Sequence, residues 1–178
     1  MHTSEFLFKN INKTKGKGNE ICLVSKSLEG EDIKGLAQSL QNKFEDAGCK
    51  VIMMEGEGPK LEKRLNESGK DETVFISLDK ESSQSVVKYA NDNEINKSKF
   101  KIYTVGATDY LLGKLEEGDV DGIVAWNEYD MGYSMIEKLI NRLANKEKIS
   151  KEVVETFYLT ASDMKNEKYI KILYPISG

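Results

Sequence analysis

Polar side chains gather at five places where a predicted strand ends and a loop or helix begins. These places hold Ser25-Lys26-Ser27, Glu55, Asp79, Gly106 to Asp109, and Trp126-Asn127. Their chemistry is hydrogen bonding by carboxylate, hydroxyl and amide groups, and stacking on one flat aromatic ring. His2 is the single histidine and lies outside these places, so no imidazole is at hand to activate a serine or cysteine nucleophile. We therefore expect no catalytic residue and no enzyme.

The sequence also lacks the patterns that hold metals, nucleotides or flavins. Cys22 and Cys49 do not form a pair at zinc-ligand spacing, and we expect them to be buried free thiols. Lys15-Gly-Lys-Gly18 precedes a strand, whereas a phosphate-binding loop follows one. A net charge of −4 weighs against a nucleic-acid surface. We expect no metal, no cofactor and no nucleic-acid partner.

Alternating strands and helices must position the polar residues. Short apolar runs predict five strands, at Glu20 to Ser25, Cys49 to Met54, Thr73 to Leu78, Phe100 to Val105 and Gly122 to Trp126. Val153 to Leu159 and Tyr169 to Tyr174 predict two more. The pattern indicates an α/β fold, a three-layer, doubly wound and mainly parallel sheet with the first strand near its centre. We expect residues 1–178 to form a single domain.

The helix predicted after Trp126 is strongly amphipathic. Its apolar side chains recur at helical spacing, at Met131, Met135, Ile136, Leu139, Ile140 and Leu143. We expect the Met131/Met135 pair to fill the core.

In open α/β sheets, ligands bind at the C-terminal ends of the strands, which makes several residues candidates for ligand binding. Asp79 can accept hydrogen bonds from a ligand hydroxyl, cap the following helix, or do both. Asp109 is a candidate too, although a helix-start charge favoured by the dipole explains it equally. Trp126 suits stacking on the apolar face of a sugar or ring, or packing at the sheet rim. Asn127 can cap the long helix, with Asp130 three residues on.

Three segments resemble the C-terminal lobe of type I periplasmic binding proteins, the family of ribose- and galactose-binding proteins and of lactose-repressor-type sensor domains. They are Val74-Phe-Ile-Ser-Leu-Asp79, Lys101-Ile-Tyr-Thr-Val-Gly106 and Glu116 to Gly132. Within the last, Ala125-Trp-Asn-Glu-Tyr-Asp-Met-Gly132 matches the family's run at Ala125, Asn127, Tyr129, Met131 and Gly132. Two residues depart from the family's pattern. Leu78, in the first segment, stands where the family usually has Asn, and Trp126, in the last, stands where it commonly has Gln. The resemblance places Thr108 or Asp109 near a ligand-binding Asp of the family.

The resemblance implies one periplasmic-binding-protein-like lobe, with the N-terminal lobe absent, that binds a sugar or sugar-like molecule for transport or signalling. Its implied partners are the small-molecule ligand and either the missing lobe or a transporter or sensor protein; a homo-oligomer is a further option. It implies an extracytoplasmic location if an export segment is missing, and otherwise the chain is cytoplasmic. The alternatives are a receiver-like signalling domain, with Asp79 as phosphoacceptor, and a flavodoxin-like carrier with Trp126 stacked on a flavin.

Overall fold

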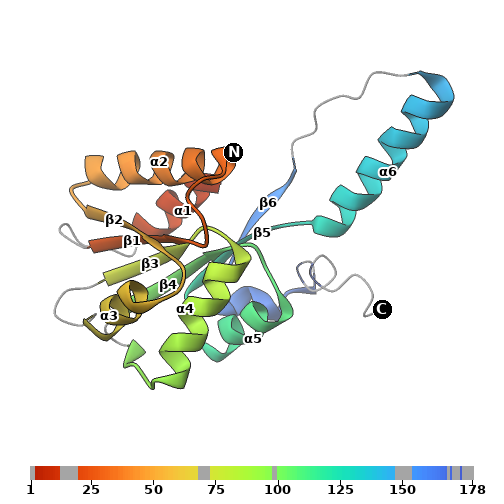
Figure 1. The fold of residues 1–178 in the computed structure, drawn as a ribbon. Coiled ribbons are helices and arrows are strands. Elements are labelled where there is room, and N and C mark those ends of the chain that lie inside the picture. Colours follow the sequence, from red (N-terminus) through yellow and green to blue (C-terminus); the bar gives the residue numbers. More distant parts are fainter. Residues whose placement is uncertain are drawn as a thin grey trace.

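Figure 1 shows the computed structural model, which describes residues 3–12, 20–67, 73–97, 100–146, 154–167, 169 and 173. Six strands form one sheet in the order β2-β1-β3-β4-β5-β6. Their bounds are β1 Glu20–Ser25, β2 Lys50–Glu55, β3 Thr73–Ser77, β4 Phe100–Val105, β5 Gly122–Trp126 and β6 Thr156–Leu159. The first five are parallel and β6 is antiparallel to β5. This confirms the mainly parallel sheet.

The burial of each strand follows its place in the sheet. Every residue of β1 and of β3 is buried, as their continuous apolar runs predict for strands covered on both faces. All residues of β2 are exposed or half-buried, because β2 is an outermost strand of the sheet. β1 therefore lies second from this edge and β3 is the central strand of the parallel part. The prediction that β1 lies near the centre was one strand off.

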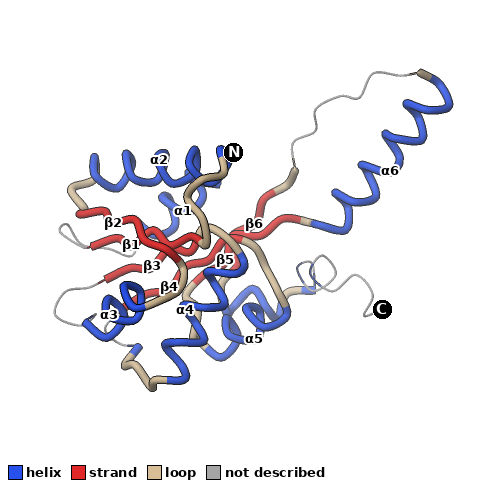
Figure 2. The backbone as a smooth tube through the Cα atoms, viewed as in Figure 1, coloured by secondary structure: helices blue, strands red, loops and turns tan. Residues whose placement is uncertain are grey.

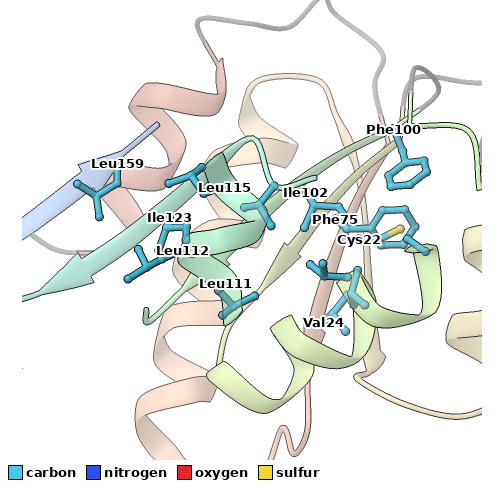
Figure 3. Packing of buried hydrophobic residues seen from close by; sticks show 14 of the residues in the cluster. Cys22, Val24, Phe75, Phe100, Ile102, Leu111, Leu112, Leu115, Ile123 and Leu159 are labelled. Atoms are coloured by element: carbon cyan, nitrogen blue, oxygen red, sulfur yellow. The ribbon is translucent and has the colours of Figure 1, made fainter. Parts of the chain in front are cut away.

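Helices cover both faces of the sheet and complete three layers (Figure 2). The helices are α1 Thr3–Asn12, α2 Glu31–Asp46, α3 Pro59–Glu67, α4 Lys80–Asp92, α5 Asp109–Glu117 and α6 Glu128–Asn145. α1 and α2 cover one face, where Leu7, Leu40 and Phe44 are fully buried. α3, α4 and α5 cover the other face, whose cluster is drawn in Figure 3. None of the described helices has the length and apolar character of a bilayer span.

α6 begins where the sequence predicts but does not pack in the core. None of its residues is buried, and Figures 1 and 2 show it projecting away from the layers. Met135 is 67% exposed, so the prediction that the Met131/Met135 pair fills the core was wrong. On the face of the sheet that α1 and α2 cover, α1 contacts β5 and β6. The place beside these two strands is therefore already taken by α1 and is not open to α6.

The C-terminal strand predictions fared unequally. β6 confirms the run to Leu159, although it begins at Thr156. Most of the run Tyr169 to Tyr174 lies outside the described residues, and its two described members, Tyr169 and Leu173, are helical. Both pack against the cluster under α5, where the Tyr169 ring meets the Phe157 ring edge-on at 5.9 Å between centroids. A strand was therefore the wrong prediction at these two residues.

Candidate functional site

Parallel strands bring the five candidate residues to one edge of the sheet. Asp79 follows β3, and Thr108 and Asp109 follow β4. Trp126 ends β5 and Asn127 follows it. Helices α4, α5 and α6 all begin at this edge, so several backbone N–H groups with a partial positive charge face it. Such an edge favours oxygen-rich or anionic groups of a ligand.

Asp79 is held firmly between β1 and α4. One carboxylate oxygen, Oδ1, accepts a hydrogen bond from the backbone N–H of Ser82 at 2.8 Å and caps α4. The other, Oδ2, accepts from the Ser25 hydroxyl at 2.8 Å and from the backbone N–H of Lys26 at 2.9 Å. Burial alone would raise the pKa of Asp79, but these hydrogen bonds outweigh it and hold the pKa below its usual value. The capping role is confirmed, and ligand binding by Asp79 stays a prediction.

Thr108 and Asn127 cap the other two helices of the edge. The Thr108 hydroxyl accepts from the backbone N–H of Leu111 at 3.3 Å and also lies 3.2 Å from the Gln84 amide nitrogen. The side-chain oxygen of Asn127, Oδ1, accepts a hydrogen bond from the backbone N–H of Asp130 at 3.0 Å, as its position in the sequence predicts. Asp109, at the first position of α5, is exposed. Of these side chains, Asp109 is the one most open to a ligand.

An ion pair that the sequence did not indicate crosses the edge. Lys80, the first residue of α4, reaches across to Glu128, the first residue of α6. Its aliphatic stem lies on Gly106, where an added Cβ would come within 2.7 Å of the Lys80 Cγ. Gly106 also has φ +86°, a left-handed conformation that glycine adopts at little cost. The only sign of this contact in the sequence is the glycine directly after β4, because a glycine there can mark a place where another group lies close to the backbone.

Trp126 is half-buried and lines two hollows. The larger, an open groove of about 610 Å³, runs along α1 and α2 and reaches Leu78, Val105 and Trp126. The smaller, of about 180 Å³, is lined by Thr108, Asp109 and Trp126 together with Ala107, Leu112, Glu128, Tyr129 and Leu173. The structure thus brings three candidate residues around one hollow, whereas Asp79 and Asn127 do not line it. A hollow of this size is smaller than a typical enclosed ligand pocket of about 300–1,000 Å³.

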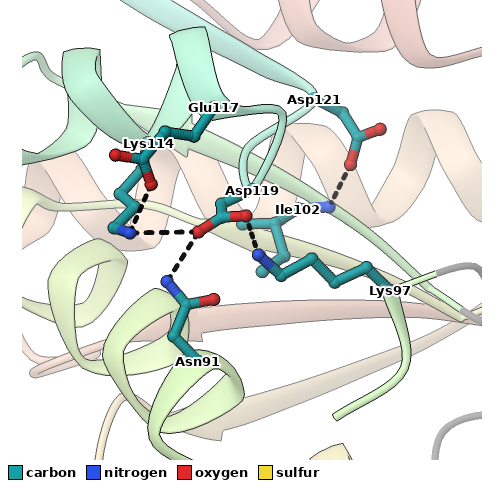
Figure 4. Close-up of polar contacts among 7 residues, drawn as sticks. All are labelled: Asn91, Lys97, Ile102, Lys114, Glu117, Asp119 and Asp121. Atoms are coloured by element: carbon teal, nitrogen blue, oxygen red, sulfur yellow. Dashed lines mark hydrogen bonds and ion pairs between the residues drawn. The ribbon is translucent and has the colours of Figure 1, made fainter. Parts of the chain in front are cut away.

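A second polar cluster lies at the opposite edge of the sheet (Figure 4). Asp119 accepts a hydrogen bond from the Asn91 amide at 2.7 Å and pairs with Lys97 and, at 3.2 Å, with Lys114. Asp121 accepts from the backbone N–H of Ile102 at 2.9 Å. These contacts join α4 and β4 to the turn before β5, so they stabilise the fold away from the candidate site. Within the described ranges, no three His, Cys, Asp or Glu side chains are grouped as metal ligands would be.

No protein-family model and no curated protein matches the sequence. Solved structures do match the fold. An ABC transporter solute-binding protein from Agrobacterium vitis with bound D-fucose has a TM-score of 0.81 at 13% identity, over 96% of this chain and 61% of that chain. GanP, a glucose-galactose binding protein from Geobacillus stearothermophilus, has a TM-score of 0.75 at 15% identity, over 91% and 60%. A chain of the XylFII-LytSN complex gives 0.75 at 14% identity, over 90% and 59%.

The chain has the periplasmic-binding-protein fold. The resemblance that the sequence shows is therefore confirmed at the level of the fold. The chain spans about 60% of the length of these structures, in keeping with a single lobe. The candidate site lies at the edge of the lobe where the parallel strands end, the usual location of ligands in open α/β sheets.

Proposed function

We propose that this chain is the small-molecule-binding lobe of a solute receptor, that its ligand is a sugar or sugar-like molecule, and that it is not an enzyme. The observation that carries the proposal is the hollow lined by Thr108, Asp109 and Trp126. An indole ring can stack on the apolar face of a pyranose. A carboxylate can accept hydrogen bonds from the sugar hydroxyls, and a threonine hydroxyl can donate to them or accept from them. The fold neighbours, two of which are named for sugars, support this ligand class.

The lobe alone can cover one side of such a ligand. Small-molecule sites usually bury about 70–90% of the ligand surface, and a hollow of about 180 Å³ cannot do so. We propose that a second lobe completes the site, and that Asp79 and Asn127 contact the ligand only when the site is closed. We expect the single lobe to bind a sugar with a dissociation constant in the millimolar range.

The receiver-like alternative is less well supported by the geometry. A phosphoacceptor aspartate needs an accessible carboxylate oxygen, yet both oxygens of Asp79 accept hydrogen bonds from the protein. Ser25 ends β1 and Lys26 and Ser27 follow it, so carboxylates for a magnesium ion are not supplied there. For the flavodoxin-like alternative, no feature of the hollow favours a flavin over a sugar.

Receptors of this kind pass their ligand to a membrane transporter or report it to a sensor. One fold neighbour is named as a complex of two proteins, XylFII and LytSN. We propose a transporter or sensor protein as the partner of the ligand-loaded receptor, and an extracytoplasmic location for the interaction.

Fluorescence titration tests the ligand class directly, because Trp126 is the only tryptophan. D-fucose, D-glucose and D-galactose should each be added, with L-leucine as a non-sugar control. We expect at least one sugar to change the emission saturably at millimolar concentrations, and Asp109→Ala to weaken that response at least threefold. Asp46→Ala, at the exposed end of α2, is the matched control and should leave it unchanged. No response to any sugar, or an equal response to leucine, would contradict the proposal.

A further inference from the structure

Two buried hydroxyl groups, those of Ser77 in β3 and Thr104 in β4, have no hydrogen-bond partner among the described residues. Both residues are fully buried, at 0% exposure. By contrast, the buried Ser25 hydroxyl donates to the Asp79 carboxylate at 2.8 Å, and the Ser83 hydroxyl donates to the Asp79 backbone carbonyl at 2.6 Å. A hydroxyl offers one donor and two acceptor positions, and burying it without a partner is costly. The hydroxyls of Ser77 and Thr104 therefore call for a partner.

The two residues are neighbours on one face of the sheet. They are partners in the parallel register of β3 and β4. Side chains alternate along a strand, so Ser77 faces the same way as Phe75, and Thr104 the same way as Ile102. Phe75 and Ile102 belong to the cluster under α3, α4 and α5, and α4 contacts both strands. The Ser77 and Thr104 side chains therefore lie next to each other on the face that α4 covers.

The spacing of the two strands suits a bridge of one small molecule. Neighbouring strands are about 4.8 Å apart, whereas a direct hydrogen bond between hydroxyls needs about 2.7–2.8 Å between the oxygens. The two hydroxyls accordingly make no hydrogen bond to each other. A water oxygen between them, with two hydrogen bonds of about 2.8 Å, spans up to about 5.6 Å. One water molecule is therefore the partner that fits the distance.

The Ser77/Thr104 pair also stands where the two strands separate. It is the last pair of the ladder that joins β3 and β4. The chain then leaves β3 for α4 at Asp79, and it leaves β4 through Gly106, whose φ is +86°. Serine is also much smaller than Phe75, which faces the same way two residues earlier. A small polar side chain where two strands part favours entry of a water molecule.

We propose that one water molecule is bound here and bridges the hydroxyls of Ser77 and Thr104. The two hydroxyls supply two of the roughly two to four hydrogen bonds that a buried water usually makes. Leaving both hydroxyls unpaired would cost more free energy than fixing one water molecule. Asp79 and Gly106 each follow two residues later, so the water joins β3 and β4 directly below the candidate site. Its binding does not depend on whether the lobe binds a sugar.

A crystal structure at a resolution that shows ordered water tests the site directly. In the wild-type chain we expect a water oxygen about 2.7–3.2 Å from both the Ser77 Oγ and the Thr104 Oγ1. In Ser77→Ala with Thr104→Val the place becomes apolar and should be dry. A direct hydrogen bond between the two hydroxyls, or hydroxyls bonded only to backbone carbonyls, would overturn the proposal. So would a water that the double variant retains, since other groups would then hold it.

Unfolding in urea provides a second test that needs no crystals. Ser77→Ala should raise the equilibrium constant for unfolding about three- to tenfold, because the water and Thr104 each lose a partner. Thr104→Val should have a similar effect, and the double variant should cost less than the two single losses combined, since one water serves both residues. Thr156→Val, at a half-buried threonine of β6, is the control and should change the constant less than about twofold.

The sign of the effect separates a bound water from two dry hydroxyls. If the hydroxyls of Ser77 and Thr104 were buried without any partner, removing either would stabilise the chain. Stabilisation by Ser77→Ala or Thr104→Val, or losses that are fully additive in the double variant, would therefore contradict a shared water.

Discussion

Asp79 is the residue on which the geometry of the candidate edge depends most. Its two oxygens tie the end of β1 to the first turn of α4, with three hydrogen bonds of 2.8–2.9 Å. Asp79→Asn keeps a single acceptor oxygen, so it can cap α4 or accept from Lys26, but not both. We expect it to lower the free energy of unfolding at neutral pH by about 1–3 kcal/mol. Urea titration of both chains measures this.

The difference in unfolding free energy between wild type and Asp79→Asn should depend on pH if it comes from the charge of Asp79, and not if it comes from packing. The pKa of Asp79 in the folded chain is below its usual value of 3.8, so the charged form is stabilised by folding. This contribution is complete above pH 3.8 and is lost as the pH falls through the lower, folded value. The stability gap between wild type and Asp79→Asn should therefore narrow below pH 3.8. Asp109→Asn, at an exposed carboxylate, should cost less than about 0.5 kcal/mol; a similar loss at both positions would refute this account.

The sequence predicted capping roles, which are local, and missed contacts that are tertiary. Asp79 and Asn127 were predicted as helix caps, and each accepts a hydrogen bond from the first turn of its helix. Thr108 caps α5 in the same way, a role that was not predicted for it. The pair between Lys80 and Glu128 joins residues 48 positions apart, and nothing in either local sequence specifies the other. The hollow beside Trp126 likewise depends on how α5 and α6 leave the sheet.

Among the elements, strands were predicted best because burial on both faces leaves a continuous apolar run. β1, β3 and β5 are such runs, and each begins and ends within one residue of its predicted bounds. Helical periodicity predicted α6 equally well as a helix, yet said nothing of where it lies. A period of 3.6 residues indicates that one face is to be covered, without indicating what covers it. At Tyr169 and Leu173 the apolar run fits a strand and a helix alike, and the wrong one was predicted.

A matched pair of leucines tests whether α6 lies outside the core. Leu112 of α5 is 2% exposed and Leu139 of α6 is 53% exposed. Leu112→Ala removes buried methyl groups and leaves a cavity, so it should cost about 2–4 kcal/mol of unfolding free energy. Leu139→Ala should cost less than about 0.5 kcal/mol. Comparable losses at the two positions would show that α6 folds back onto the sheet.

At the scale of the whole molecule, three layers make β1 one of the best protected strands. Its neighbours β2 and β3 pair with it on both sides, and the clusters beneath α2 and α4 cover its two faces. A strand so enclosed opens only when the layers separate, so its exposure should have the free energy of global unfolding. The chain carries a probe of this at Cys22, and a contrasting one at the half-buried Cys49.

The two thiols should react with an alkylating reagent by different routes. Burial raises the pKa of the Cys22 thiol to about 12, against the opposing effect of the Lys50 ammonium, and only a thiolate is an effective nucleophile. The half-buried Cys49 should be modified in native buffer. Cys22 should react only at the rate at which global unfolding exposes its thiol. In a Cys49→Ser background, mass spectrometry should show Cys22 labelling that rises with urea with the full dependence of global unfolding. Labelling of Cys22 that is insensitive to urea would mean that β1 opens locally, and that the sheet is not closed by its layers around this strand.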